Sequence, residues 1–228
     1  MFGLDDRIAS LGTGDAFLLV VAVAILLGLR HATDPDHLTA VTTLIASDGD
    51  RSPRRAARLG GAWGLGHATS LVAFGIPIVL FNSYLPDAVQ QGAELAVGVL
   101  IMALAIRLLR RWRRHGFGGH RHAPARPARS PAQAFGIGLV HGMGGSAGVG
   151  LLLLAGIPDR PVAVVALLLF AACTAISMAI ASTGFGYTLS RDGVAVRFTA
   201  VAPALGALSL AFGAWYALGA VNAVPYVF

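Results

Sequence analysis

The first long apolar stretch of the chain, residues 16–46, reads AFLLVVAVAILLGLRHATDPDHLTAVTTLIA. As one helix it would measure about 46 Å, whereas ~20 residues suffice to cross ~30 Å of hydrocarbon. A patch of charged and imidazole side chains interrupts it, namely Arg30, His31, Asp34, Asp36 and His37. Within the patch, Pro35 clashes with the carbonyl of His31 and has no N–H to donate to it. The stretch therefore predicts a membrane helix that is broken around Pro35.

The chain as a whole is also apolar. Of its 228 residues, 56% are hydrophobic and only 12% are charged, half the ~25% of an ordinary soluble domain. Five further apolar stretches follow, at residues 59–81, 88–106, 131–157, 161–186 and 198–224. Each approaches or exceeds the length of a membrane span. We therefore expect an all-α integral membrane protein with six transmembrane helices and the lipid bilayer as its surroundings.

The basic residues are all arginines, and their positions indicate orientation. Fourteen of the seventeen lie in the segments after the first, third and fifth stretches, whereas Arg7 and Arg160 lie on the other side. The positive-inside rule then places both termini outside a plasma membrane. Arginines clustered between apolar runs indicate topology, so no nucleic-acid partner is expected despite the net charge of +6. The acidic leader, with Asp5 and Asp6, argues against a cleaved signal peptide, and the single cysteine, Cys173, excludes a disulfide scaffold.

Two similar halves are expected on either side of a Gly-, Pro-, Arg- and His-rich segment at residues 111–130, which we predict to be a flexible cytoplasmic loop. Residues 1–110 and 131–228 would each hold three helices, and an odd number gives the halves opposite orientations, as in inverted-repeat transporters. Residues 28–31 (GLRH) and 138–141 (GLVH) support such a repeat. The loop also holds His115, His120 and His122. These are expected to be solvated, with transient metal holding as the alternative.

The patch in the first stretch carries the chemistry. On an unbroken helix His31 and His37 would lie about 120° apart, but a break at Pro35 lets both turn, with Asp34 and Asp36, toward one point. Two imidazoles with one or two carboxylates suit borderline divalent ions such as nickel, cobalt and zinc. Magnesium and calcium favour oxygen ligands, and copper(I) favours Met and Cys. The alternative is a structural ion-pair network between Arg30 and the aspartates, although ionisable groups at membrane depth are functional by default. Arg30 is expected to be a charge partner of the aspartates and not a metal ligand.

Two further histidines lie alone in later apolar stretches, His67 in the second and His141 in the fourth. Small residues recur every four positions around His141, at Gly138, Gly142, Ser146 and Gly150. Such a stripe lets another helix approach closely. We predict that both histidines are metal ligands or support the ligands, the alternative being a hydrogen bond to a neighbouring carbonyl.

These motifs resemble those of the nickel/cobalt transporter family. Residues 31–37 (HATDPDH) are similar to its His-x4-Asp-His signature, in a helix that runs from outside to inside. Residues 65–67 (LGH) are similar to its Leu-Gly-His motif one span later, and residues 138–142 (GLVHG) to a segment of a shorter, urease-accessory-type branch.

The resemblance implies high-affinity uptake of nickel or cobalt, with His31, Asp36 and His37 as essential residues and Asp34 matched as well. Typical members have eight spans with the signature in the second, whereas six are predicted here with the signature in the first. They also often carry Ala where this chain has Pro35.

We therefore expect a secondary transporter of divalent transition metal that is not an enzyme and has no cofactor, the metal being its substrate. No phosphate-binding loop of the Walker type can form without lysine, so energy must come from the membrane potential, a proton gradient or a partner ATPase. One alternative is a membrane subunit that aids urease or hydrogenase metallocentre assembly without transport. Another is an acyltransferase with His31 as base and Asp36 as its orienting group. The choice of metal and any homo-oligomeric state stay open.

Overall fold

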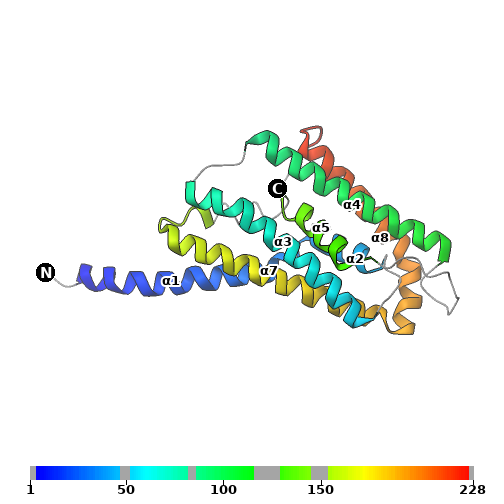
Figure 1. Ribbon diagram of the computed structural model, residues 1–228, viewed down its shortest axis with the longest axis horizontal. Coiled ribbons are helices and arrows are strands. Elements are labelled where there is room, and N and C mark those ends of the chain that lie inside the picture. The colour runs from blue at the N-terminus through cyan, green and yellow to red at the C-terminus, as the bar shows by residue number, and fades with distance from the viewer. Residues whose placement is uncertain (1–3, 47–51, 82–85, 116–128, 145–153, 226–228) are drawn as a thin grey trace.

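The described residues of the computed structural model, 4–46, 52–81, 86–115, 129–144 and 154–225, are helical apart from short turns and connections. The helices are α1 (Leu4–His31), α2 (Pro35–Ala46), α3 (Pro53–Phe81), α4 (Asp87–His115), α5 (Pro131–His141), α7 (Arg160–Leu189) and α8 (Asp192–Ala220). Figure 1 shows the long helices packed together with the short helices α2 and α5 among them, while the N-terminal part of α1 projects beyond the rest. The all-α prediction is confirmed for this part of the chain.

Four of these helices, α3, α4, α7 and α8, are long and apolar enough to cross a membrane. Residues 17–31 of α1 and all of α2 form a fifth candidate if the bent pair counts as one span. The remaining predicted span, the fourth, at residues 131–157, lies partly outside the described residues. A multi-pass membrane protein is thus supported, whereas the count of six and the inverted repeat stay predictions.

The break predicted at Pro35 is present. α1 ends at His31, α2 begins at Pro35, and the two axes differ by 46°. The connecting turn is closed by the N–H of Thr33, which donates to the Arg30 carbonyl at 2.8 Å, and by the N–H of Asp34, which donates to the His31 carbonyl at 3.1 Å. Proline suits the first position of a helix, where its missing N–H is not needed. The first predicted helix is therefore confirmed as broken.

A second break corrects the prediction of a continuous helix over residues 131–157. α5 ends at His141, where the N–H of Gly142 donates to the Gly138 carbonyl at 2.9 Å, and a turn follows as far as residue 144. The sequence after His141 is rich in glycine, which has low helix propensity. α1 and α5 therefore both end on the histidine of a Gly-Leu-x-His sequence, His31 in one and His141 in the other.

Helix α3 lies between α5 and α7. α3 packs against α5 on one side and α7 on another, α1 packs along α7, and α4 pairs with α8 (Figure 1). Helix α4 also continues to His115, so it extends into the segment predicted as a loop from residue 111.

The contact between α3 and α5 depends on glycine. A Cβ atom on Gly138 would meet the Trp63 carbonyl, and one on Gly66 would meet the Phe135 carbonyl, so either would force the helices apart. The Ser70 hydroxyl, also on α3, donates to the Leu139 carbonyl on α5 at 2.7 Å. The predicted close approach is confirmed for Gly138 and Gly142, which both face α3, while Ser146 and Gly150 lie outside the described residues.

The outer surface of the bundle is apolar. Leu19 and Leu26 on α1, Ile180 on α7 and Leu208 on α8 are all 65–69% exposed. The ionisable side chains of the first stretch are instead buried, apart from Arg30. Lipid-facing apolar side chains around a polar interior are what a membrane-spanning bundle requires.

Candidate metal centre

All six side chains predicted at the site are buried, with exposed fractions of 6% or less. They come from different elements, with His31 at the end of α1, Asp34 in the turn, Asp36 and His37 in the first turn of α2, His67 within α3 and His141 at the end of α5. The two helix breaks and the α3–α5 contact therefore bring the predicted residues together.

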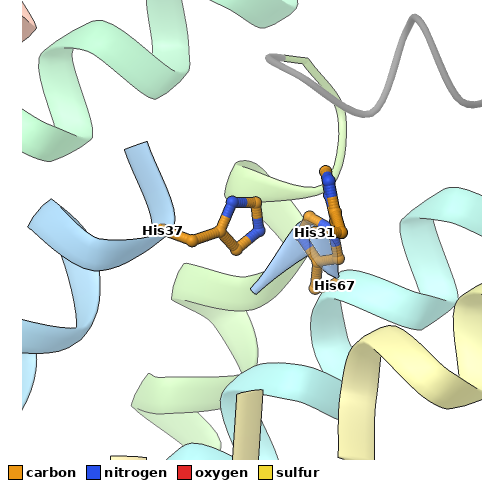
Figure 2. Close-up of side chains that lie close together, drawn as sticks. All are labelled: His31, His37 and His67. Carbon is orange, nitrogen blue, oxygen red and sulfur yellow. The ribbon is translucent and has the colours of Figure 1, made fainter. Parts of the chain in front are cut away.

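Three histidines form the first group, His31, His37 and His67. The Nε2 atoms of His31 and His67 lie 3.1 Å apart. The ring centroid of His37 lies 4.4 Å from that of His31 and 4.8 Å from that of His67. Figure 2 shows the His37 ring extending from α2 toward the other two rings. One potential ligand atom from each residue lies within 4.8 Å of the others.

The second group combines a carboxylate with two imidazoles. Asp36 places Oδ1 at 3.3 Å from Nδ1 of His37 and Oδ2 at 3.3 Å from Nε2 of His141. The rings of His37 and His141 meet edge to face with centroids 4.4 Å apart. These three residues also offer ligand atoms within 4.8 Å of one another.

Several imidazole nitrogens of this cluster have no hydrogen-bond partner among the described residues. They are Nε2 of His37, Nδ1 of His141 and Nδ1 of His67, whereas Nδ1 of His37 and Nε2 of His141 lie 3.3 Å from Asp36. A buried polar group without a partner costs ~1–3 kcal/mol, so this arrangement is unfavourable unless something else occupies those lone pairs. A metal ion is the species that imidazole lone pairs bind in a closed, buried site.

The spacing within the three-histidine group fits an ion. With metal–nitrogen distances of ~2.0–2.1 Å, two nitrogens 3.1 Å apart subtend roughly 100° at the metal. That angle lies between the square-planar or octahedral value and the tetrahedral value. The geometry of His31 and His67 is therefore compatible with coordination of one shared divalent ion.

Asp34 contacts Nδ1 of His31, the ring nitrogen that does not face His67. Its Oδ2 is 3.1 Å from Nδ1 of His31 and its Oδ1 is 3.4 Å from the guanidinium of Arg30. The prediction that Arg30 is a charge partner for an aspartate is therefore confirmed for Asp34. A carboxylate at Nδ1 fixes the tautomer that leaves Nε2 of His31 unprotonated toward His67. In an acyltransferase-type site the residue orienting His31 would be Asp36, whereas Asp34 provides this hydrogen bond.

Aromatic side chains enclose the cluster, and the sequence analysis did not identify them. The Trp63 ring lies 5.8 Å from that of His37 and 5.7 Å from that of His141, and the Phe170 ring lies 5.5 Å from that of His31. Both aromatic residues are almost fully buried. Trp63 precedes His67 by one helical turn of α3, which places both on the same face. These rings exclude water and so strengthen electrostatic interactions within the site.

The structure describes one of the three histidines of the predicted loop. His115 is the last residue of α4, and His120 and His122 lie outside the described residues.

Glu94, the single glutamate, is buried on α4 and accepts a hydrogen bond from the side chain of Gln90 at 3.1 Å.

The fold and the site define a multi-pass membrane protein with a buried histidine–aspartate cluster. The chain is similar to the urease accessory protein UreH of Bacillus sp. (strain TB-90), with 27% identity over 209 residues that cover 87% of this chain and 90% of that protein. This match confirms the resemblance to the urease-accessory type that the motifs indicated. The relative's name describes an accessory protein, in agreement with the expectation that this chain is not an enzyme. No protein-family model and no solved structure matches the chain.

Proposed function

We propose that the chain is a secondary transporter that takes up nickel, cobalt or both across the plasma membrane through its buried histidine–aspartate cluster. The observation that carries this proposal is the convergence of four histidines from four helices in one buried cluster, where they form two triads of potential metal ligands that share His37. Nitrogen-rich sites with one carboxylate suit nickel, cobalt and zinc better than magnesium or calcium.

In this proposal His31, His37, His67, His141 and Asp36 bind the ion, and Asp34 acts by orienting His31. The two interruptions, after His31 and after His141, place non-helical backbone beside the cluster. Irregular backbone at membrane depth occurs in transporters where it lines a substrate pathway. The buried ligands would replace the hydration shell that the ion loses on entry.

The membrane potential is a sufficient source of energy. With both termini outside, as the arginine distribution favours, uptake moves a divalent cation toward the negative interior. At 100 mV the ion gains about 4.6 kcal/mol, or ~2.3 kcal/mol per charge, which corresponds to roughly 10³-fold accumulation. No coupled reaction is then required.

A membrane subunit that supports metallocentre assembly is the second candidate. The name of the similar protein, an accessory protein of urease, favours it. Both candidates use the same metal site and differ in whether the chain alone moves the ion.

Uptake by the purified protein in proteoliposomes separates the two candidates. With an imposed inside-negative potential, the wild-type chain should accumulate radioactive nickel, and His37→Ala should not. His122→Ala is the control, because it removes an imidazole from the predicted loop only. Nickel binding without accumulation in the absence of other proteins would favour the assembly role, and absence of binding would contradict both.

A further inference from the structure

The buried cluster contains two overlapping triads of potential ligands. We name the first, His31, His37 and His67, the three-histidine site, and the second, Asp36, His37 and His141, the carboxylate site. Each triad offers ligand atoms within 4.8 Å of one another, and His37 is the one residue they share. An imidazole can bind a metal ion through either ring nitrogen, so His37 can serve both triads.

The two nitrogens of His37 face different neighbours. Its Nδ1 lies 3.3 Å from Asp36 Oδ1, on the side of the carboxylate site. Figure 2 shows the opposite edge of the ring, which carries Nε2, facing His31 and His67. Both nitrogens are buried, and Nε2 has no hydrogen-bond partner among the described residues. An ion bound through one nitrogen of His37 therefore uses the ligands of one triad at a time.

Each triad is spaced for an ion of its own. The His31–His67 separation of 3.1 Å corresponds to an angle of roughly 100° at a metal ~2.0–2.1 Å from each nitrogen. The 3.3 Å between Nε2 of His141 and Oδ2 of Asp36 corresponds to roughly 105° at similar bond lengths. Both angles are usual for first-row divalent ions.

The two sites differ in charge. The three-histidine site supplies three neutral nitrogens, whereas the carboxylate site adds the negative charge of Asp36. Three nitrogens favour nickel, cobalt and zinc over the hard ions magnesium and calcium. At the carboxylate site, the negative charge of Asp36 compensates the positive charge of a dehydrated cation.

We propose that these are two successive binding sites for one transported divalent ion, and that His37 transfers the ion between them by exchanging one ring nitrogen for the other. This inference rests on the proposed transport function. The ion keeps protein ligands throughout, and two adjacent sites of moderate affinity allow both entry and release, as conduction requires.

The test removes, from each site in turn, one ligand that the other site does not use. Nickel binding to the purified full-length protein is measured by equilibrium dialysis, the ligands are counted by X-ray absorption at the nickel edge, and uptake is measured in proteoliposomes. His141→Gln should keep nickel on imidazoles at the three-histidine site, with affinity within about tenfold of wild type, while uptake falls by ~100-fold or more. His67→Gln should likewise keep nickel affinity near that of wild type, now with the ion at the carboxylate site, while uptake falls as strongly as in His141→Gln. His37→Gln should lose both.

Glutamine keeps much of the side-chain volume of histidine, and His122→Gln serves as the control that should change neither quantity. If His67→Gln and His141→Gln each lost binding and uptake in parallel, a single site would explain the cluster and the two-site proposal would be wrong, while the transport proposal would stand. If wild-type protein neither bound nor transported nickel, both proposals would fail.

Discussion

Replacing Gly138 with alanine should disable the metal site without removing any ligand. Gly138 lies on the face of α5 that contacts α3, where an added Cβ would be 2.9 Å from the backbone nitrogen of His67 and would meet the Trp63 carbonyl oxygen even sooner. Ordinary contacts of a Cβ begin at 3.4 Å. The added methyl group must therefore move α3 and α5 apart, and His67 and His141 with them.

The expected magnitude follows from the packing. Overfilling a close-packed contact costs ~1–3 kcal/mol, which corresponds to roughly 5- to 150-fold in a binding constant if the strain is relieved at the site. Metal–ligand distances tolerate deviations of only ~0.2 Å, whereas restoring an ordinary contact here requires a shift of about 0.5 Å or more. Nickel affinity and uptake should therefore fall by ~10- to 100-fold in Gly138→Ala.

Gly136→Ala is the matched control. Gly136 lies two residues earlier on α5, where a Cβ would have nothing within 4 Å, and alanine should even favour the helix by up to ~1 kcal/mol. Both variants would be purified, checked for monodispersity, and assayed for nickel binding and proteoliposome uptake. Wild-type affinity in Gly138→Ala, or an equal loss in Gly136→Ala, would refute the claim that close helix approach assembles the site.

Four further outcomes are expected. In Pro35→Ala the new alanine N–H can restore the helical hydrogen bond to the His31 carbonyl, so uptake should fall several-fold although every ligand is present. Unchanged uptake kinetics would show that the proline does not maintain the break. Asp34→Ala should weaken nickel binding by ~10- to 100-fold, whereas Asp34→Asn, which keeps an acceptor for Nδ1 of His31, should lose less; equal losses would contradict an orienting role. Uptake should fall as the pH is lowered, because protons and metal compete for the same imidazole nitrogens, and a rate that rises in acid would oppose imidazole ligation. The double variant His120→Ala/His122→Ala should stay within a few-fold of wild-type uptake, and its loss of transport would move the essential metal contacts into the loop.

The break in the first stretch was predictable because its cause is covalent. A proline ring acts on the backbone wherever it occurs, so Pro35 alone indicates where α1 must end. Convergence of His31 and His37 follows directly from that break. A close contact between the helix of His141 and another helix was also predicted from the glycine spacing around Gly138, although that spacing does not identify the partner helix.

Other features depend on tertiary context and could not be predicted. No proline marks the end of α5 at His141, and the two walls of the site, Trp63 and Phe170, are apolar residues in helices that are apolar on all sides. In such helices periodicity does not distinguish the inner face from the lipid face. The shape of the turn also determines that Asp34 contacts His31, whereas Asp36 lies between His37 and His141.

Helix ends show a related limit. The second apolar stretch begins at Leu59, but α3 begins at Pro53 and includes Arg54, Arg55 and Arg58 in its first two turns. Hydropathy reports only the part of a helix that lies in hydrocarbon, whereas arginine side chains at a helix end can extend to the interface. The apolar stretches therefore predicted which helices exist better than where they begin.

The most direct test of the central claim is anomalous diffraction from crystals of the nickel-loaded protein, recorded on both sides of the nickel absorption edge. We expect an anomalous peak inside the bundle within bonding distance of His37, together with His31 and His67 or with Asp36 and His141. A nickel peak confined to the segment that holds His120 and His122, with none in the buried cluster, would contradict it.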